Sequence, residues 1–359
     1  MQNIIRIGVS GYGLMGKVHS SCYRLLPTCS PLPYKAELNT LLTTRSNLDA
    51  PFQRVLNDID HTLDGIDLFD CCTPNSIHYQ QIHAAMQKGI AVYCEKPLCS
   101  SCEDARKLAD EAEALSIVNQ TALVYRFMPA IAILRAVLNK HRAVSFSMTL
   151  IHDHFLKHPK EKEWRGSVQQ QGGALGDLGI HALDALRFIL GPLNITYAEI
   201  NSIDADSSGW HTTDPSIETD DDAIIHLSSS TAKGIATVSK IRVNTGPEWT
   251  IRIDTDDGVY ESDSDHYERV LNIAKDESKW IALDQMTDDA YCMNLKRWLS
   301  KLPLGKNIGP HFASIASVCE SVCTGSQQEG VPTFKEAYIS QQLIDECWKA
   351  AAGNANSIE

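Results

Sequence analysis

The feature that most constrains this chain is a glycine-rich turn that directly follows an apolar segment near the amino terminus. Residues 4–9 form a largely apolar run that leads into Gly11-Tyr12-Gly13-Leu14-Met15-Gly16. At a strand-to-helix junction, the first glycine permits a tight turn, the second lets the backbone approach a pyrophosphate, and the third lets the helix pack against the sheet. Helix N-termini also attract phosphate groups. The sequence therefore predicts a dinucleotide site that contains Gly11, Gly13, Leu14, Met15 and Gly16.

The first 125 residues alternate between strand-like and helix-like segments. Apolar runs predict strands at residues 4–10, 36–44, 66–73, 90–95 and 117–124, and amphipathic patterns predict helices at residues 14–26, 78–88 and 102–115. Ser100 or Ser101 is suited to cap the last of these helices. Strands separated by helices form βαβ units, whose right-handed crossovers build a doubly wound parallel sheet. We therefore expect an α/β dinucleotide-binding domain over residues 1–125.

A different pattern begins at about residue 126. We expect helices at residues 129–140, 174–190, 288–299, 311–324 and 335–352, and strand-like segments at residues 142–154 and throughout residues 195–260. A run of successive strands is typical of a mostly antiparallel sheet. We therefore expect residues 126–359 to form a second, α+β domain.

The composition narrows the classes of function. The formal net charge of −13 disfavours nucleic acid as a partner, because phosphate binding requires a basic surface. No apolar run is long enough for a membrane span, and glycines and serines interrupt the amino-terminal segment that a signal peptide would need. The eleven cysteines fit a reducing compartment, and Cys99 and Cys102 lack the second ligand pair of a zinc site. We therefore predict a cytoplasmic protein without a metal site.

The end of the second predicted strand indicates which dinucleotide binds. NAD-specific proteins usually present Asp or Glu there, to bind the ribose 2′-hydroxyl. The segment Leu41-Leu42-Thr43-Thr44-Arg45-Ser46 contains no carboxylate. Arg45, next to the hydroxyl of Thr44, suits a 2′-phosphate through charge-assisted hydrogen bonds. We favour NADP over NAD, with the alternative that Arg45 stacks on adenine and both cofactors are used.

Two further segments carry residues suited to catalysis. Lys96 follows an apolar strand and precedes Pro97, so its ammonium group is expected at the ligand-binding edge of the sheet, where it would stabilise a developing alkoxide. Asp177, His181 and Asp184 are spaced to share one face of a helix. That face would present an imidazole as general base beside a carboxylate. The alternatives are a structural histidine or a metal site made by these three residues.

In order and spacing, these motifs resemble those of the Gfo/Idh/MocA family, the glucose–fructose oxidoreductase and inositol dehydrogenase group. The matching segments are residues 11–16, Thr73-Pro74-Asn75 with His78, Glu95-Lys96-Pro97, Tyr125-Arg126-Phe127 with Pro129, and residues 173–184. The resemblance implies a Rossmann domain followed by an α/β domain, whose open antiparallel sheet often mediates homodimers or homotetramers. The missing carboxylate after the second strand departs from the NAD-specific members of the family.

The resemblance also implies roles for individual residues. It implies that Lys96, Asp177 and His181 are the catalytic residues. It implies that the cofactor lies beside residues that follow the third and fourth strands, namely Thr73, Pro74, Asn75, His78, Glu95 and Lys96.

The substrate side is expected to include residues beyond the catalytic ones. His152 and His154 alternate along one predicted strand and therefore share a face. The family resemblance places this stretch and the following loop beside the substrate, where Trp164 would stack on a sugar ring and Arg165 or His154 would bind hydroxyl groups or a carboxylate. Arg126 completes the expected substrate contacts. The alternative for this stretch is a solvated sheet edge.

The resulting hypothesis is an NAD(P)-dependent oxidoreductase that acts on a secondary alcohol or carbonyl of a sugar, cyclitol or sugar derivative. One alternative is a glycosidase that uses bound NAD for a transient oxidation in the same site. Another is a non-catalytic regulator that binds a sugar or NADP. Both enzyme hypotheses take a small carbohydrate or cyclitol as partner, and none of the three requires nucleic acid or a membrane.

Overall fold

The computed structural model describes residues 3–30, 32–46, 48–153, 170–202, 220–243, 245–275 and 277–355. The chain forms two compact units. The first comprises Met1–Phe127 and Met293–Tyr338, and the second comprises Met128–Cys292 and Ile339–Glu359. This division differs from the single boundary expected after residue 125, because residues 293–338 pack with the first unit.

The first unit contains a six-stranded sheet whose pairings are parallel. Its strand order is β3-β2-β1-β4-β5-β6, so the chain winds outward from β1 to one edge and then from β4 to the other. This is the doubly wound arrangement predicted from the sequence. The strands are β1 (Asn3–Ser10), β2 (Tyr34–Leu42), β3 (Arg54–Leu56), β4 (Leu68–Cys71), β5 (Ala91–Cys94) and β6 (Asn119–Thr121).

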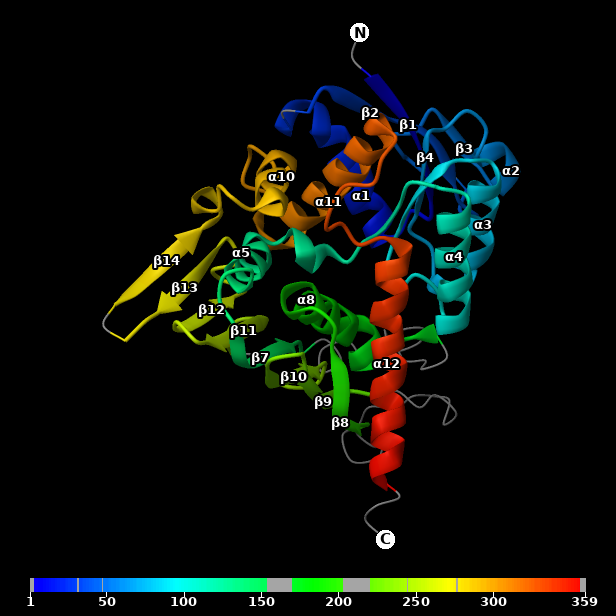
Figure 1. The fold of residues 1–359 in the computed structure, drawn as a ribbon. Helices are drawn as coiled ribbons and strands as arrows, with labels where there is room; N and C mark the ends of the chain where they lie inside the picture. Colours follow the sequence, from blue (N-terminus) through cyan, green and yellow to red (C-terminus); the bar gives the residue numbers. More distant parts are fainter. Residues whose placement is uncertain are drawn as a thin grey trace. The chain divides into compact units, whose positions relative to one another are not determined.

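Helices cover both faces of this sheet (Figure 1). On one face, α1 (Leu14–Cys29) packs against β2 and α11 (Gly305–Thr324). On the other, α3 (His78–Gln87) packs against β4, β5 and α4 (Cys102–Ala114). Because both faces are covered, every side chain of β4 is buried, including that of Asp70. The shorter elements are α2 (Ile59–Thr62), η1 (Asn75–Ile77) and η2 (Val124–Phe127).

Two local features of the first unit bear on the sequence predictions. The hydroxyl oxygen of Ser101 accepts a hydrogen bond from the backbone N–H of Asp104 at 3.1 Å, so Ser101 is the N-cap of α4. The edge strand β3 was missed, because its three residues are exposed or half-buried and show no apolar alternation. Edge strands need only one partner, and a short one leaves little pattern in the sequence.

Strands β1, β4 and β5 end at the same level, and their carboxyl ends lie side by side. Ser10 of β1 pairs with Cys71 of β4, and Cys71 pairs with Cys94 of β5. The ladder continues one residue further, because the N–H of Cys72 donates to the carbonyl of Ser10 at 2.8 Å and the N–H of Glu95 donates to that of Cys71 at 2.9 Å. The loops after β1, β4 and β5 therefore leave the sheet side by side.

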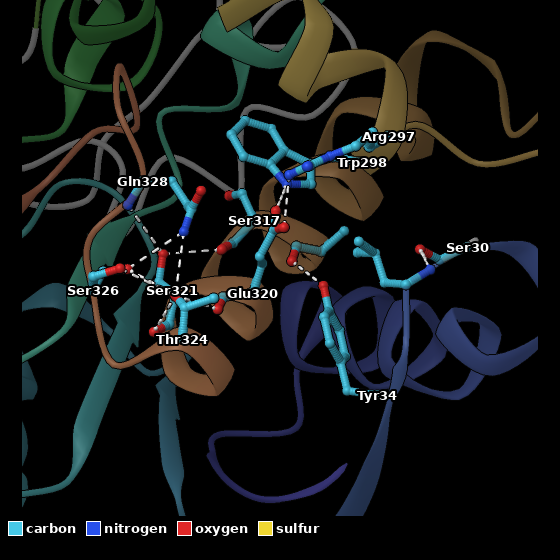
Figure 2. A network of polar contacts seen from close by, with 12 residues as sticks. Ser30, Tyr34, Arg297, Trp298, Ser317, Glu320, Ser321, Thr324, Ser326 and Gln328 are labelled. Atoms are coloured by element: carbon cyan, nitrogen blue, oxygen red, sulfur yellow. Dashed lines mark hydrogen bonds and ion pairs between the residues drawn. The ribbon is translucent and has the colours of Figure 1, made fainter. Parts of the chain in front are cut away.

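Polar contacts anchor α11 within the first unit (Figure 2). The hydroxyl of Tyr34 donates to the carbonyl of Ala316 at 2.6 Å. Glu320 accepts hydrogen bonds from the indole N–H of Trp298 at 2.5 Å and from Arg297 at 2.6 Å. These bonds join the start of β2 and the end of α10 (Ala290–Trp298) to the same helix. These contacts between residues far apart in the sequence hold residues 293–338 in the first unit.

The second unit contains an eight-stranded sheet in the order β14-β13-β12-β11-β7-β10-β9-β8. Only the β7–β10 pairing is parallel, so the sheet is mostly antiparallel, as predicted. The strands are β7 (Ala143–Ile151), β8 (Asn194–Asn201), β9 (Asp222–Ser228), β10 (Lys233–Ser239), β11 (Trp249–Thr255), β12 (Val259–Asp263), β13 (Arg269–Ile273) and β14 (Ser278–Ala282). Strands β13 and β14 were not predicted from the sequence.

Helices pack on one face of the second sheet. α5 (Pro129–Leu138) contacts β13 and β14, and α8 (Ile180–Leu190) contacts β7 and β10 as well as α5. Along β7 and β11, buried apolar residues alternate with exposed or half-buried ones, so the opposite face is the more polar one. η6 (Leu283–Gln285) and α12 (Phe334–Ala355) complete the fold. No helix in the described ranges combines the length and apolar character that crossing a membrane requires.

The helix predicted at residues 174–190 is not regular throughout. It begins with a π-helical segment, η5 (Leu175–Gly179), and continues as α8 until Gly191, which adopts φ +79°. A Cβ atom on Gly176 would lie 1.9 Å from the carbonyl oxygen of Gln171. The glycine is therefore required because another part of the backbone approaches it closely.

Candidate active site

The three glycines of the first turn have different surroundings. Gly11 has φ +85°, and a Cβ atom there would lie 2.7 Å from the carbonyl oxygen of Cys72. A Cβ atom on Gly16 would lie 2.2 Å from the carbonyl oxygen of Gly11. At Gly13, by contrast, a Cβ atom would meet nothing within 4 Å. Gly11 thus allows the turn, Gly16 allows the close packing of α1, and Gly13 leaves room for a pyrophosphate.

The start of α1 completes this phosphate cradle. Gly13 is its N-cap and offers no side-chain hydrogen bond, so the N–H groups of Leu14 and Met15 depend on another partner. Backbone N–H groups at a helix N-terminus are suited to bind phosphate oxygens. These residues therefore fit a dinucleotide.

The end of β2 lies beside the glycine turn, because the N–H of Gly11 donates to the carbonyl of Leu42 at 3.0 Å. Thr44 and Arg45 follow this strand and are exposed. The hydroxyl oxygen of Thr43 accepts a hydrogen bond from the N–H of Arg45 at 3.2 Å, which orients the backbone there. Arg45 thus follows the second strand, after which the ribose 2′-substituent of a dinucleotide is generally bound.

The loop after β4 is tied to the loop after β5 by His78. The Nε2 atom of this buried imidazole lies 2.8 Å from the carbonyl oxygen of Thr73, and Nδ1 lies 3.2 Å and 3.1 Å from those of Pro97 and Leu98. Thr73 also lies against the turn, since a Cβ atom on Gly11 would be 3.1 Å from its methyl group. Pro74 is exposed and Asn75 is buried at the start of η1. Among these predicted cofactor contacts, His78 is the residue whose ring contacts the backbone of both loops.

Glu95 and Lys96 follow β5 directly. Glu95 is 8% exposed, and its carboxylate lies 3.1 Å from Nε2 of His19 and accepts a hydrogen bond from the N–H of Lys96 at 3.1 Å. Burial raises the pKa of Glu95, but the hydrogen bond and charge of His19 lower it to about 2. Lys96 is half-buried and precedes a cis peptide bond to Pro97. The structure thus brings Lys96, Thr73 and the glycine turn to one sheet edge.

In the second unit, Asp177 lies in η5 and pairs with a lysine that the sequence analysis did not select. Nζ of Lys240, directly after β10, lies 2.5 Å from the carboxylate of Asp177, and the lysine side chain is only 2% exposed. A buried ammonium group is stable only beside a counter-charge. The pair therefore holds Asp177 as a carboxylate.

A second carboxyl group supports the segment that carries Asp177. Oδ2 of Asp220 accepts a hydrogen bond from the N–H of Leu175 at 2.6 Å, and a Cβ atom on Gly173 would lie 1.7 Å from Oδ1 of Asp220. Burial raises the pKa of Asp220 to about 7, although the Leu175 N–H lowers it. The start of η5 thus rests on a buried carboxyl group that titrates near neutral pH.

His181 and Asp184 lie on α8 and are both buried. His181 is 9% exposed. Asp184 accepts a hydrogen bond from the hydroxyl of Ser340 at 2.9 Å, which ties α8 to α12. Asp184 therefore has a structural contact. Among the described residues, no group of potential metal ligands combines Asp177, His181 and Asp184. The groups that do occur are Cys71 with His78 and Cys94, His19 with Glu95 and His311, and His19 with Asp70 and Cys72.

The expected substrate residues are placed only in part. Arg126 is 1% exposed, and its guanidinium pairs with Glu336 at 2.8 Å. This ion pair lies within the first unit and gives no support to a substrate contact. His154, Trp164 and Arg165 lie outside the described residues, so their roles remain predictions.

All eleven cysteines are free thiols.

Comparison with known proteins identifies the family. The model described as "Oxidoreductase family, NAD-binding Rossmann fold" matches residues 5–122, and that described as "Oxidoreductase family, C-terminal alpha/beta domain" matches residues 147–358. The chain belongs to the Gfo/Idh/MocA oxidoreductase family. The resemblance inferred from the sequence motifs is therefore confirmed.

Curated Gfo/Idh/MocA relatives match part of the chain. Levoglucosan dehydrogenase of Pseudarthrobacter phenanthrenivorans is 30% identical over 223 residues, which are 58% of this chain and 55% of that protein. Inositol 2-dehydrogenase of Rhizobium meliloti is 27% identical over 54% of this chain and 57% of its own length. The chain thus spans little more than half the length of these relatives. The solved structure of levoglucosan dehydrogenase in complex with NADH and levoglucosan has a TM-score of 0.84 over 98% of both chains, at 21% identity, and so shares the fold.

Four polar residues of this Gfo/Idh/MocA chain escaped the sequence analysis. They lie next to candidate site residues or in one network with them, and all are buried except the half-buried His311: His19, Asp70, Lys240 and His311. Two of them left a signal. Asp70 is an acidic residue inside an apolar strand, and Lys240 follows an apolar strand just as Lys96 does. A buried charge requires a partner, so both positions could have been flagged.

Proposed function

We propose that this Gfo/Idh/MocA chain is an NAD(P)-dependent oxidoreductase that transfers a hydride between the nicotinamide and a carbinol carbon. The observation that carries the proposal is the arrangement at the edge of the first sheet. There the glycine turn, with open space beside Gly13, follows β1, and Lys96 follows β5; these strands flank β4 and end at the same level. A dinucleotide bound at the turn would have an ammonium group near its reactive end.

Each proposed catalytic residue has a distinct role in alcohol oxidation. His181 takes the hydroxyl proton, so that the O–H bond breaks while the carbon–oxygen double bond forms. Lys96 stabilises the negative charge that develops on this oxygen. Asp177, kept ionised by Lys240, orients the substrate hydroxyl. A bound nicotinamide supplies the acceptor for the hydride that leaves carbon.

We propose a sugar, cyclitol or sugar derivative as the substrate. The names of the relatives support this class, since they include levoglucosan dehydrogenase, inositol 2-dehydrogenase and glucose-6-phosphate 3-dehydrogenase of Bacillus subtilis. The predicted contacts of His154, Trp164 and Arg165 belong to this proposal.

The first prediction concerns turnover. With a panel of sugars and cyclitols, we expect reduction of NADP⁺ or NAD⁺, followed by absorbance at the wavelength of the reduced nicotinamide. Lys96→Ala and His181→Ala should each lower kcat by at least about 100-fold, because each removes a group that acts on the reacting oxygen. Lys107→Ala and His61→Ala, which change exposed side chains, should leave kcat unchanged.

Three outcomes would contradict this prediction. Full turnover in both active-site variants would refute the assigned roles. Release of a free sugar without net cofactor reduction would favour a glycosidase, and cofactor binding without any turnover would favour a regulator.

The second prediction concerns the cofactor. Arg45 follows β2 where the 2′-phosphate of NADP is expected, and no carboxylate lies in residues 41–46. Arg45→Ala should weaken NADP⁺ binding by about tenfold or more while changing the Kd of NAD⁺ little, because a charge-assisted bond to phosphate is lost. Fluorescence titration of both cofactors measures this, with Arg24→Ala on the exposed side of α1 as control. An equal effect on both Kd values would refute the preference for NADP.

The third prediction concerns self-association, which we propose to occur through the polar face of the second sheet. One continuous row of cross-strand neighbours on this face combines aromatic, aliphatic and charged side chains: Trp280, Leu271, Glu261, Arg252, Ser147, Ile235, His226 and Tyr197. Ile235 is 39% exposed near its middle. Such a surface suits an isologous interface.

Light scattering should therefore give a dimer or tetramer of the 39.7 kDa chain. Ile235→Glu should shift it toward the monomer, because a buried unpaired carboxylate destabilises an interface. Val55→Glu, on an edge strand of the first unit, should not. A wild-type protein that is monomeric at micromolar concentration would contradict the proposal.

A further inference from the structure

A buried histidine of the first unit lies between two carboxylates. His19, on α1, has a side chain with 0% exposure. Its Nδ1 atom lies 3.0 Å from Oδ2 of Asp70 on β4, and its Nε2 atom lies 3.1 Å from Oε1 of Glu95 after β5. One imidazole therefore joins α1 to the ends of two neighbouring strands.

Carboxylate oxygens face both nitrogens of this ring: Nδ1 is hydrogen-bonded to Asp70, whereas Nε2 and Oε1 of Glu95 form an ion pair without hydrogen-bond geometry. A neutral imidazole has a single N–H and can donate to only one carboxylate, whereas an imidazolium donates from both nitrogens. Burial lowers the pKa of His19, but the charge and hydrogen bond of Asp70 oppose this effect, and the pKa lies well above the ordinary value of 6.5. His19 is therefore a buried cation at neutral pH.

The groups around His19 agree with this charge. Burial raises the pKa of Cys72, so its thiol is neutral and lies 3.2 Å from Oδ1 of Asp70, where it can donate. Burial also lowers the pKa of His311 to about 4, which leaves its ring neutral. The titratable and charged groups that face His19 come from α1, from β4 and β5 with the loops after them, and from α11: Cys22, Tyr23, Asp70, Cys72, Tyr93, Glu95, Lys96 and His311.

The bridge continues from Glu95 to the backbone of Lys96. Oε1 of Glu95 contacts His19, and Oε2 accepts the hydrogen bond from the N–H of Lys96. The backbone N–H of Glu95 is itself held by the carbonyl of Cys71. Both carboxylate oxygens are thus engaged, and the peptide that carries Lys96 is fixed to the same cation as α1.

We propose that His19 is a positioning residue whose imidazolium holds Glu95, and through it Lys96, in place beside the glycine turn. The consequence for Lys96 rests on the function proposed above, whereas the charge of His19 and its bridge do not. Asp70 is the second partner that keeps the cation buried. Without this bridge, a buried carboxylate at Glu95 would lose its counter-charge and bind a proton more readily.

The charge is tested directly on the wild-type protein. In histidine-labelled protein, ¹⁵N NMR should show both ring nitrogens of His19 protonated at pH 8, with no titration between about pH 5 and 9. Comparison with His19→Gln and Glu95→Gln spectra assigns the signal among the thirteen histidines. A ring with one proton, whether neutral or holding a divalent cation at Nε2, would overturn the proposal.

The positioning role is tested by kinetics. His19→Gln should lower kcat by about 10- to 100-fold with little change in KM, since small displacements of a reacting group have effects of this size. It should also introduce an acid limb in the pH profile of kcat, because Glu95 then titrates at a higher pH. The limb should vanish in the His19→Gln/Glu95→Gln double variant, in which residue 95 cannot ionise.

His83→Gln is the matched control, because His83 also pairs with a carboxylate, Glu111, but at the exposed surface. It should keep the wild-type kcat and pH profile. A wild-type kcat in His19→Gln, or a lowered kcat without an acid limb, would refute the positioning role. If His19→Gln does not fold, Asp70→Asn replaces it, and kcat should then fall as the pH rises, because His19 without the Asp70 charge loses its proton at a lower pH. An inactive wild type with a doubly protonated His19 would refute the proposed function alone.

Discussion

The candidate site of the first unit depends on one constraint, which is that the parallel strands β1, β4 and β5 end at the same level. Ser10, Cys71 and Cys94 pair across β1, β4 and β5, and backbone bonds extend the ladder to Cys72 and Glu95. The loops that follow therefore share one edge of the sheet. Close packing sets their separation, because any side chain on the first or third glycine of the turn would strike a carbonyl oxygen.

Buried charges then fix the side chains of these loops. In the first unit, the cation of His19 lies between two carboxylates, and in the second, Lys240 lies against Asp177. Ions that leave water are stable only with a well-placed counter-charge, so each pair permits few other arrangements. In the first unit His19 thus lies beside the segment that carries Lys96, and in the second unit Lys240 lies beside Asp177. We assign a role in catalysis to both Lys96 and Asp177.

The sequence predicted the features that arise from local pattern. Apolar runs located most strands, Ser101 capped its helix as expected, and the spacing of the glycines matched the three different surroundings in the structure. What it did not predict depends on contacts between distant residues. The return of residues 293–338 to the first sheet and the pairing of His19 with Asp70 cannot be inferred from neighbouring residues in the sequence. The pairing of Arg126 with Glu336, 210 residues away, likewise has no local signature.

The central claim is that the turn at Gly13 holds the pyrophosphate of a nicotinamide dinucleotide. The most direct test is calorimetric titration of NADP⁺ and NAD⁺ into the wild-type chain and into Gly13→Val. A Cβ atom at Gly13 meets nothing within 4 Å and its backbone is extended, with φ −78° and ψ −157°, so we expect a folded variant, which its Tm checks. We predict one dinucleotide per chain for the wild type and at least about tenfold weaker binding for the variant, a loss of about 1.4 kcal/mol. Equal affinity in a folded variant, or no binding by the wild type, would contradict the account.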